Sequence, residues 1–182
     1  MGELAWYVVA AIGIFNPFTS GLVRAARGHE GFFQGFWKGF SNYFKIIGGT
    51  LALDSNLTLG QNIVNIISRF TWELPQTIAG LAYNLVHNVI GSVEWVKYKY
   101  GATVVKSRAQ SGGVALGSFI TGSTSIEADA NNPLFQHEYG HVLQSRSFGW
   151  SYLARVGIPS AFDDESYGRH AFHPVEADAN RR

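Results

Sequence analysis

The hydrophobic period changes twice along this sequence, and these changes constrain the fold more than any other feature. Up to about residue 90, apolar residues recur at the i, i+3, i+4 spacing of helices. Two short β-type runs follow, at 102–107 and 114–120, around a loop that contains Gly112 and Gly113. Helical spacing returns from Leu134. The sequence therefore predicts an α+β fold, mostly helical, with a small β-hairpin next to a later helix.

The first strongly helical segment, 31–48, is aromatic on one side. We expect this aromatic stripe to face the core, with a membrane-surface helix as the alternative. Glycines every fourth residue permit close packing of the same helix against a neighbour. The stripe consists of Phe33, Phe36, Trp37, Phe40 and Phe44, and the glycines are Gly31, Gly35 and Gly39.

Further helices are predicted at 61–70, 75–90 and 134–148, and the segment 175–182 resembles the start of another. The 134–148 helix has local signals at both ends. Asn132 and Pro133 suit its N-cap and first turn, and Gly149 suits its end. His87 lies within the 75–90 helix with no partner pattern, so we expect a packed histidine there.

The chain start is apolar. Leu4 to Val23 contains no charged residue, close to the ~20 apolar positions that a membrane-spanning helix needs. Asn16 and Pro17 interrupt it, and Glu3 stands where a signal peptide would be basic. We expect a core or docking segment, with a membrane-active segment or part of an export region as alternatives. The predicted organisation is an apolar segment at 1–30 and one domain at 31–182.

Composition excludes several classes of function. With 14 Lys and Arg against 13 Asp and Glu, the net charge of +1 gives no electrostatic footprint for nucleic acid. The absence of cysteine excludes a disulfide framework, a thiolate nucleophile and a cysteine-based zinc site. Any metal centre must therefore use histidine and carboxylate ligands.

Such ligands occur at His137 and His141, within the 134–148 helix. Residues four apart on a helix lie about one turn along the same face, so two imidazoles can reach one zinc ion. Glu138 emerges beside the first histidine, where its carboxylate can act as a general base. Gly140 weakens a helix by about 1 kcal/mol, which favours a close approach by another backbone. The alternative is a buried polar network without metal.

A catalytic zinc usually has three protein ligands. Glu176 is our choice for the third, because it opens the last helix and shares a face with Asn180, which can orient a neighbouring ligand. The alternatives are His173, His170 and Asp178. The predicted cofactor is one Zn²⁺ ion.

The HEYGH helix with a later glutamate-bearing helix resembles gluzincins of the thermolysin type, in which a Glu-x-x-x-Asp segment supplies the third ligand; Asn180 stands at the Asp position here. More specifically, the chain from Gly31 onward resembles the C-terminal toxin or effector domains of bacterial RHS-repeat and other polymorphic toxins. Only HEYGH is diagnostic of chemistry. The residues that carry the second resemblance are DSNLTLGQNIVNIISRFTWELPQT (54–77), GATVV (101–105), LGSFITG (116–122), EADANNPLFQHEYGHVLQS (127–145), VGIPS (156–160) and EADANRR (176–182).

The resemblance implies a secreted or delivered bacterial effector, with an immunity protein as a candidate partner. From the residues, we expect hydrolysis of peptide bonds in a protein or peptide substrate. An extended substrate would pair with the 114–120 run as an edge strand. Donors for the oxyanion are needed besides the metal, and the candidates are Tyr152, Tyr167, His170 and His173.

Two other functions compete with this one. The first is a metal-binding interaction module without turnover. The second is a membrane-acting toxin in which residues 4–47 insert and the histidine site is secondary.

Overall fold

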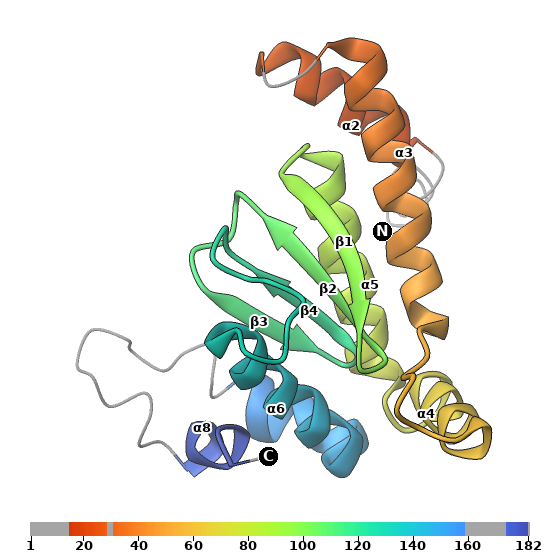
Figure 1. Cartoon of the computed structure of the whole chain (residues 1–182), viewed down its shortest axis with the longest axis vertical. Helices are drawn as coiled ribbons and strands as arrows, with labels where there is room; N and C mark the ends of the chain where they lie inside the picture. Colours follow the sequence, from red (N-terminus) through yellow and green to blue (C-terminus); the bar gives the residue numbers. More distant parts are fainter. Residues whose placement is uncertain (1–14, 29–30, 159–173, 182) are drawn as a thin grey trace, which may run out of the picture.

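The computed structural model describes residues 15–28, 31–158 and 174–181, and it is an α+β fold that is mostly helical, as the sequence predicts. The described residues begin with α2 (Asn16–Ala26), α3 (Phe32–Gly48), a 3₁₀ turn η1 (Gly49–Leu51), α4 (Leu59–Phe70) and α5 (Leu74–Val89). We call α2, α3, α4 and α5 the helical layer. Figure 1 shows α2 and α3 side by side at one end of the molecule and α4 at the other end of α3.

Four strands follow: β1 (Val93–Lys99), β2 (Ala102–Ser107), β3 (Gly113–Leu116) and β4 (Phe119–Gly122). They form one sheet in the order β1-β2-β4-β3, in which β2 and β4 are parallel and the other pairs are antiparallel. The predicted pairing of 102–107 with 114–120 as a hairpin is wrong. A turn at Gly117, with φ of +61°, divides that run into β3 and β4, and β1 takes the other edge of β2.

The chain continues through α6 (Pro133–Phe148), a 3₁₀ turn η2 (Gly149–Ser151), a π-helical turn η3 (Leu153–Gly157) and α8 (Pro174–Ala179). The predicted caps of α6 are confirmed: the Asn132 side chain accepts a hydrogen bond from the Phe135 N–H at 2.9 Å, and Pro133 is in the first turn. Gly149 ends the helix with a φ of +52°.

The sheet has helices on both faces (Figure 1). Side chains of neighbouring strand residues point to opposite faces, so Val104 and Ile120 pack toward α6 while Val105 and Phe119 pack toward α3 and α5. The α6 side is completed by Ala102, Ala115, Ile126, Phe135 and Val142, and the opposite side by Ile46, Leu85, Val93 and Val96. The first core fixes α6, which carries the histidine motif, against the sheet, and the second fixes α3 and α5 against the opposite face.

The helical layer differs from the sequence expectation in which side of each helix is buried. The aromatic stripe of α3 faces outward, with Phe33 77% and Trp37 62% exposed, so its assignment to the core is wrong. The glycine prediction is confirmed at Gly35 and Gly39, which face α2. α2 follows the same pattern, because Asn16 and Ser20 are buried while Phe18 and Leu22 are exposed. Residues 1–14 lie outside the described residues.

Buried polar residues of the helical layer donate to backbone carbonyls. Arg69 of α4 is 1% exposed and donates to the carbonyls of Thr50, Ala52 and Gly101, the first two at 2.9 Å and the last at 2.7 Å. Burial is the main reason that the pKa of Arg69 is lowered to about 10, with a smaller contribution from the nearby Arg146 charge. Each of these bonds satisfies a carbonyl that lies outside regular strand or helix pairing.

Among the described residues, none of the helices combines the length and the apolar content that crossing a bilayer requires.

Candidate metal and catalytic site

The candidate site is built on α6, where His137 and His141 lie one turn apart. Their ring centroids are 4.8 Å apart and the ring planes are nearly perpendicular, at 89°. His141 is 4% exposed, and Glu138 between them is also 4% exposed. The structure thus brings together the three motif residues on the side of α6 that is shared with β3 and α8.

Each histidine is held at Nδ1 by a side-chain amide oxygen. His137 Nδ1 lies 2.9 Å from Asn180 Oδ1, and His141 Nδ1 lies 2.8 Å from Gln144 Oε1. An amide oxygen only accepts hydrogen bonds, so both Nδ1 atoms carry the proton. The Nε2 atom of each ring then has the lone pair that a metal ion needs, which is the arrangement that second-shell partners give to ligating histidines.

The hydrogen bond to His141 continues to a carboxylate. Gln144 is 1% exposed, and its Nε2 donates to Asp178 Oδ2 at 2.9 Å. Asp178, one of the alternative third ligands, thus contacts the amide that orients His141. The chain His141–Gln144–Asp178 links α6 to α8 through three polar side chains. Such a chain fixes the orientation of the His141 ring, since the amide oxygen can only accept a hydrogen bond and the amide nitrogen can only donate one.

The approach of α8 explains the glycine inside the motif. A Cβ atom on Gly140 would lie 2.1 Å from the carbonyl oxygen of Ala179, a distance that no side chain tolerates. The predicted close approach of a second backbone at Gly140 is confirmed, and that backbone is α8. The contact places Asn180 and Asp178 beside the two histidines.

The carboxylate of Glu138 lies against the start of β3. A Cβ on Gly113 would be 2.1 Å from Glu138 Oε1, so only glycine leaves room for the carboxylate at this position. Gly113 carries no signal in the sequence that marks this role, because the contact depends on how β3 packs on α6. Gln144 does carry one, since it is three residues from His141 and therefore on the same helix face.

Some of the remaining predicted site residues lie among the described residues and others do not. Tyr152 is 1% exposed, and its hydroxyl donates to the Ala115 carbonyl of β3 at 2.8 Å, which places it in the core as a support for the sheet edge. Tyr167, His170 and His173 lie outside the described residues. The backbone of Glu176 lies in α8, two residues before Asp178, and its side chain is also outside the described set. Within that set, no three His, Cys, Asp or Glu side chains are grouped as metal ligands.

The donors fit zinc in their chemistry. Two imidazoles with hydrogen-bonded Nδ1 atoms are the pair that His-rich zinc sites use, and a carboxylate on the next helix would complete the set. His137 and His141 would hold the metal, and Glu176 in α8 is the proposed third ligand. α8 is the helix whose backbone passes α6 at Gly140.

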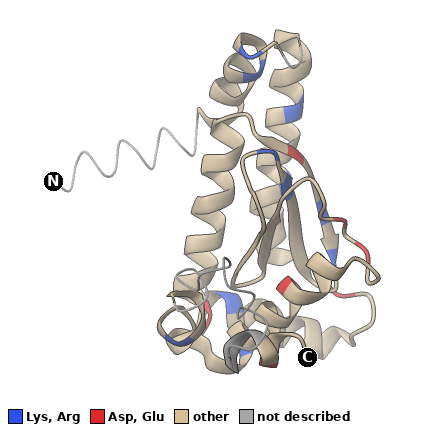
Figure 2. Ribbon diagram, turned by 90° about the vertical axis from the view of Figure 1, so that its left-hand side faces the viewer, with Lys and Arg blue, Asp and Glu red and all other residues tan. Residues whose placement is uncertain are grey.

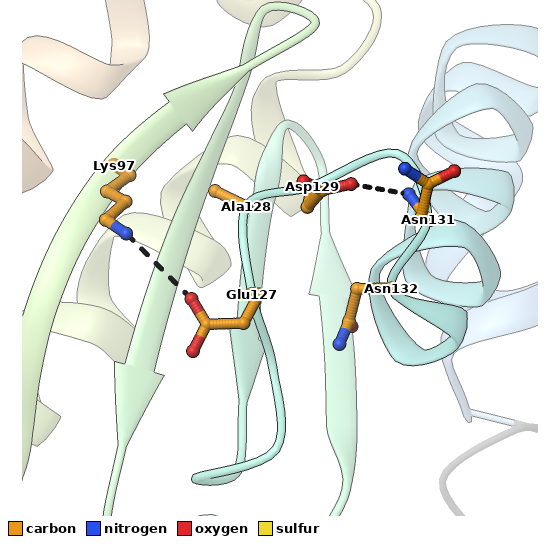
Figure 3. A pocket seen from close by; sticks show the side chains of 6 residues that line it. All are labelled: Lys97, Glu127, Ala128, Asp129, Asn131 and Asn132. Carbon is orange, nitrogen blue, oxygen red and sulfur yellow. Dashed lines mark hydrogen bonds and ion pairs between the residues drawn. The ribbon is translucent and has the colours of Figure 1, made fainter.

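A surface hollow of ≈ 430 Å³ lies elsewhere, at the N-terminal end of α6 (Figure 3). It is lined by Lys97, Glu127, Ala128, Asp129, Asn131 and Asn132, and it includes no residue of the histidine site. Lys97 lies 3.9 Å from Glu127, and Asp129 accepts from the Asn131 N–H at 2.7 Å (Figure 3). Its charged groups are thus engaged with one another, and we assign the chemistry to the histidine site.

The buried histidine of α5, His87, is hydrogen-bonded within the core. His87 Nδ1 lies 2.7 Å from Ser107 Oγ, and burial lowers the pKa of the ring. The prediction of a packed histidine is confirmed, because the ring is 6% exposed and joins α5 to β2.

Comparisons of the chain with family models, with curated proteins and with solved structures find no match. The functional argument therefore rests on the site itself.

Proposed function

We propose that this chain is a zinc-dependent metallopeptidase. The observation that carries the proposal is the pair His137 and His141, one turn apart on α6, each with its Nδ1 held by an amide oxygen. With Nδ1 as the donor, the Nε2 atoms of both rings are the positions from which two histidines one turn apart on a helix face can reach one metal ion. A zinc ion uses both lone pairs.

Zinc at this place would supply positive charge that polarises a peptide carbonyl and makes a water molecule easier to deprotonate. Glu138 is the general base of the proposal: its carboxylate takes the proton of the attacking water and passes it to the leaving amine. Burial keeps bulk water from this carboxylate, and Gly113 leaves the space in which it lies. Tyr167, His170 and His173 remain the candidates for the oxyanion donor.

Substrate would bind along β3. β3 and β4 are antiparallel, and the Ser123 N–H donates to the Gly112 carbonyl at 2.8 Å, which makes Gly112 and Ser123 a hydrogen-bonded pair. Hydrogen-bonded and non-hydrogen-bonded pairs alternate in antiparallel strands, so the N–H and C=O groups of Gly113 and Ala115 point away from β4. An extended peptide would pair with these groups beside Glu138. Tyr152 already donates to the Ala115 carbonyl, so the Gly113 end is the better docking position.

The resemblance to the domains of polymorphic toxins places this activity in a secreted or delivered bacterial effector, with an immunity protein as partner. This biological setting is part of the proposal and depends on the resemblance alone. The metallopeptidase assignment depends on α6 and α8 and can be tested separately.

The test measures zinc content and hydrolysis together. Wild type should contain about one zinc per chain and should cleave an unfolded protein substrate, with the products detected by mass spectrometry. Glu138→Gln should keep its zinc and lose about 10²–10⁴-fold of the rate, because an amide cannot accept the proton. Glu127→Gln, a glutamate outside the site with ion pairs to Lys97 and Lys106, is the matched control and should be fully active.

Two outcomes would overturn the proposal. Protein that contains no zinc and takes none up on titration would exclude the metal centre. Protein that binds zinc but cleaves no substrate would favour a metal-binding interaction module over an enzyme, whereas a Glu138→Gln variant that keeps full activity would show that Glu138 is not the general base.

A further inference from the structure

The helices α2 and α3 pack against each other through small residues. A Cβ on Gly39 would lie 2.6 Å from Ser20 Oγ, and a Cβ on Gly21 would lie 2.8 Å from the Phe36 Cα atom. Glycine is therefore required at these contacts, since any side chain would push the two backbones apart. The contact surface of this hairpin buries little apolar volume.

Polar side chains fill the rest of the inner side. Asn16 donates to the Leu85 carbonyl at 2.8 Å, and Asn42 donates to the Val93 carbonyl at 3.3 Å. Arg24 is fully buried and also donates to the Val93 carbonyl. These bonds tie the hairpin to α5 and β1 by hydrogen bonding. The inner side of α2 and the N-terminal part of α3 thus lacks the large apolar side chains that water-surrounded helices usually bury.

The large apolar side chains of the hairpin face outward instead. We call this surface the aromatic face; Phe33 is 77% exposed, Trp37 62% and Phe44 56%. Ring contacts connect it from α2 along α3, from Phe18 through Phe36 to Phe40, with centroid separations of 5.0 and 6.0 Å. The aromatic face consists of Phe15, Phe18, Leu22, Phe32, Phe33, Trp37, Phe40 and Phe44.

The charged residues within α2 and α3 are of one sign, and Glu30 lies in the segment that joins the two helices. In α2 and α3 every charged residue is basic: Arg24, Lys38 and Lys45, followed by Arg27 just after α2. The end of the molecule formed by this hairpin, at the top of Figure 2, shows blue and no red. Acidic residues are concentrated instead around the sheet and the site. An apolar surface with basic residues beside it matches the interface of an anionic bilayer, where acyl chains lie under negative headgroups.

We infer that the aromatic face of α2 and α3 binds the surface of an anionic lipid bilayer. Glycine contacts and hydrogen bonds hold the inner side of the hairpin against the protein, so its large apolar side chains are left for the bilayer surface. Phenylalanine and tryptophan side chains enter the boundary of headgroups and acyl chains, and the exposed Arg27 and Lys45 contact lipid phosphates, whereas Arg24 is buried against the Val93 carbonyl. This inference is independent of the proposed peptidase activity.

The test is flotation of the full chain with vesicles. The protein should float with vesicles of phosphatidylcholine mixed with phosphatidylglycerol, and less with phosphatidylcholine alone or at high salt. The triple variant Phe33→Ser, Trp37→Ser, Phe44→Ser should reduce partitioning to anionic vesicles at least about tenfold, because it removes three aromatic rings that would leave water on binding. Trp150→Ser, which changes a tryptophan 72% exposed outside the hairpin, is the control and should bind as wild type.

Bilayers that contain brominated acyl chains give a second readout. They should quench the tryptophan fluorescence of wild type more than that of Trp37→Phe, because Trp37 enters the bilayer. Circular dichroism of the triple variant should match that of wild type, which shows that the variant is folded. If the three serines unfold the protein, the quenching test with Trp37→Phe still applies, because this conservative substitution preserves the fold.

Three results would contradict the inference. The first is that the full chain does not float with anionic vesicles. The second is that the triple variant binds the vesicles as strongly as wild type. The third is that wild type forms a dimer in lipid-free solution and that the triple variant is a monomer. The last would assign the aromatic face to self-association.

Discussion

In α4 the buried side chains are Asn62, Ser68 and Arg69, whereas Leu59 is 74% exposed. In α6 the apolar Phe135 and Val142 are buried in the core on the sheet, together with the polar Glu138, His141, Gln144 and Ser145. Both helices are well capped and both pack against the rest of the chain. The helical layer therefore buries much of its polarity and exposes apolar side chains, and the site half, formed by the sheet, α6 and α8, is built around an apolar core. The difference teaches that apolar periodicity predicts a helix but does not decide which side is buried.

The physical reason lies in the backbone around the helical layer. The segment Thr50–Ala52 and the β1–β2 turn at Gly101 present carbonyl groups that Arg69 satisfies. A buried Ser145 hydroxyl donates to Glu73 Oε2 at 2.8 Å and joins this layer to α6. Polar groups that complete such networks stabilise a fold only as complete sets, because an unpaired buried group costs more than its bond contributes.

The largest expected effect follows from this contrast. Arg69→Met should lower the free energy of unfolding by about 3–5 kcal/mol, since it removes the donor of two buried carbonyls and one partly buried carbonyl. Arg27→Met, an exposed arginine of the same layer, and Phe44→Ser, on the aromatic face, should each change it by less than about 0.5 kcal/mol. Urea denaturation followed by circular dichroism measures all three. A larger loss in Phe44→Ser than in Arg69→Met would reverse the comparison.

The side chains that orient the two histidines by hydrogen bonds should affect metal binding more than folding. Gln144→Met should weaken zinc affinity about 10–100-fold, as should Asn180→Ala, because each removes the oxygen that orients one histidine. Glu176→Ala should weaken it further, as the loss of a proposed ligand, while His173→Ala should leave it unchanged. Competition with a chromophoric chelator gives the affinities, and Gln136→Met, on the exposed side of α6, is the control.

This order separates ligands from orienting residues. Zinc affinity that survives in Glu176→Ala but is lost in His173→Ala would move the third ligand to His173. Unchanged affinity in Gln144→Met would mean that its hydrogen bond to His141 has only a structural role.

The smallest expected effect tests the contact between α6 and α8. Gly140→Ala adds a methyl group 2.1 Å from the Ala179 carbonyl oxygen. Overpacking costs about 1–3 kcal/mol, and the better helix propensity of alanine returns about 1 kcal/mol, so a net loss of roughly 0–2 kcal/mol is expected. Zinc affinity should fall as well, because α8 carries Asn180 and Asp178. Gly60→Ala in α4, with open space around its Cβ, should not destabilise the protein. A stabilised Gly140→Ala variant would show that α8 does not pack on α6.

The sequence by itself determined the features that depend on neighbouring residues. The ends of α6 follow from Asn132, Pro133 and Gly149, because capping is a local hydrogen-bonding problem. The juxtaposition of His137 and His141 follows from helix geometry alone. The close approach at Gly140 was also predictable, because glycine inside a helix indicates a neighbouring backbone.

Only the tertiary structure decided the partners of these elements. The parallel pairing of β2 with β4, the role of Gly113 beside Glu138 and the link from Gln144 to Asp178 join residues far apart in the chain. The aromatic stripe of α3 faces outward for the same reason. Buried polar side chains such as Asn42 take the inner side, where they donate to carbonyls that are distant in the sequence. A helix records its amphipathic period in its own sequence, but the choice between its two faces depends on which groups elsewhere in the chain need a partner.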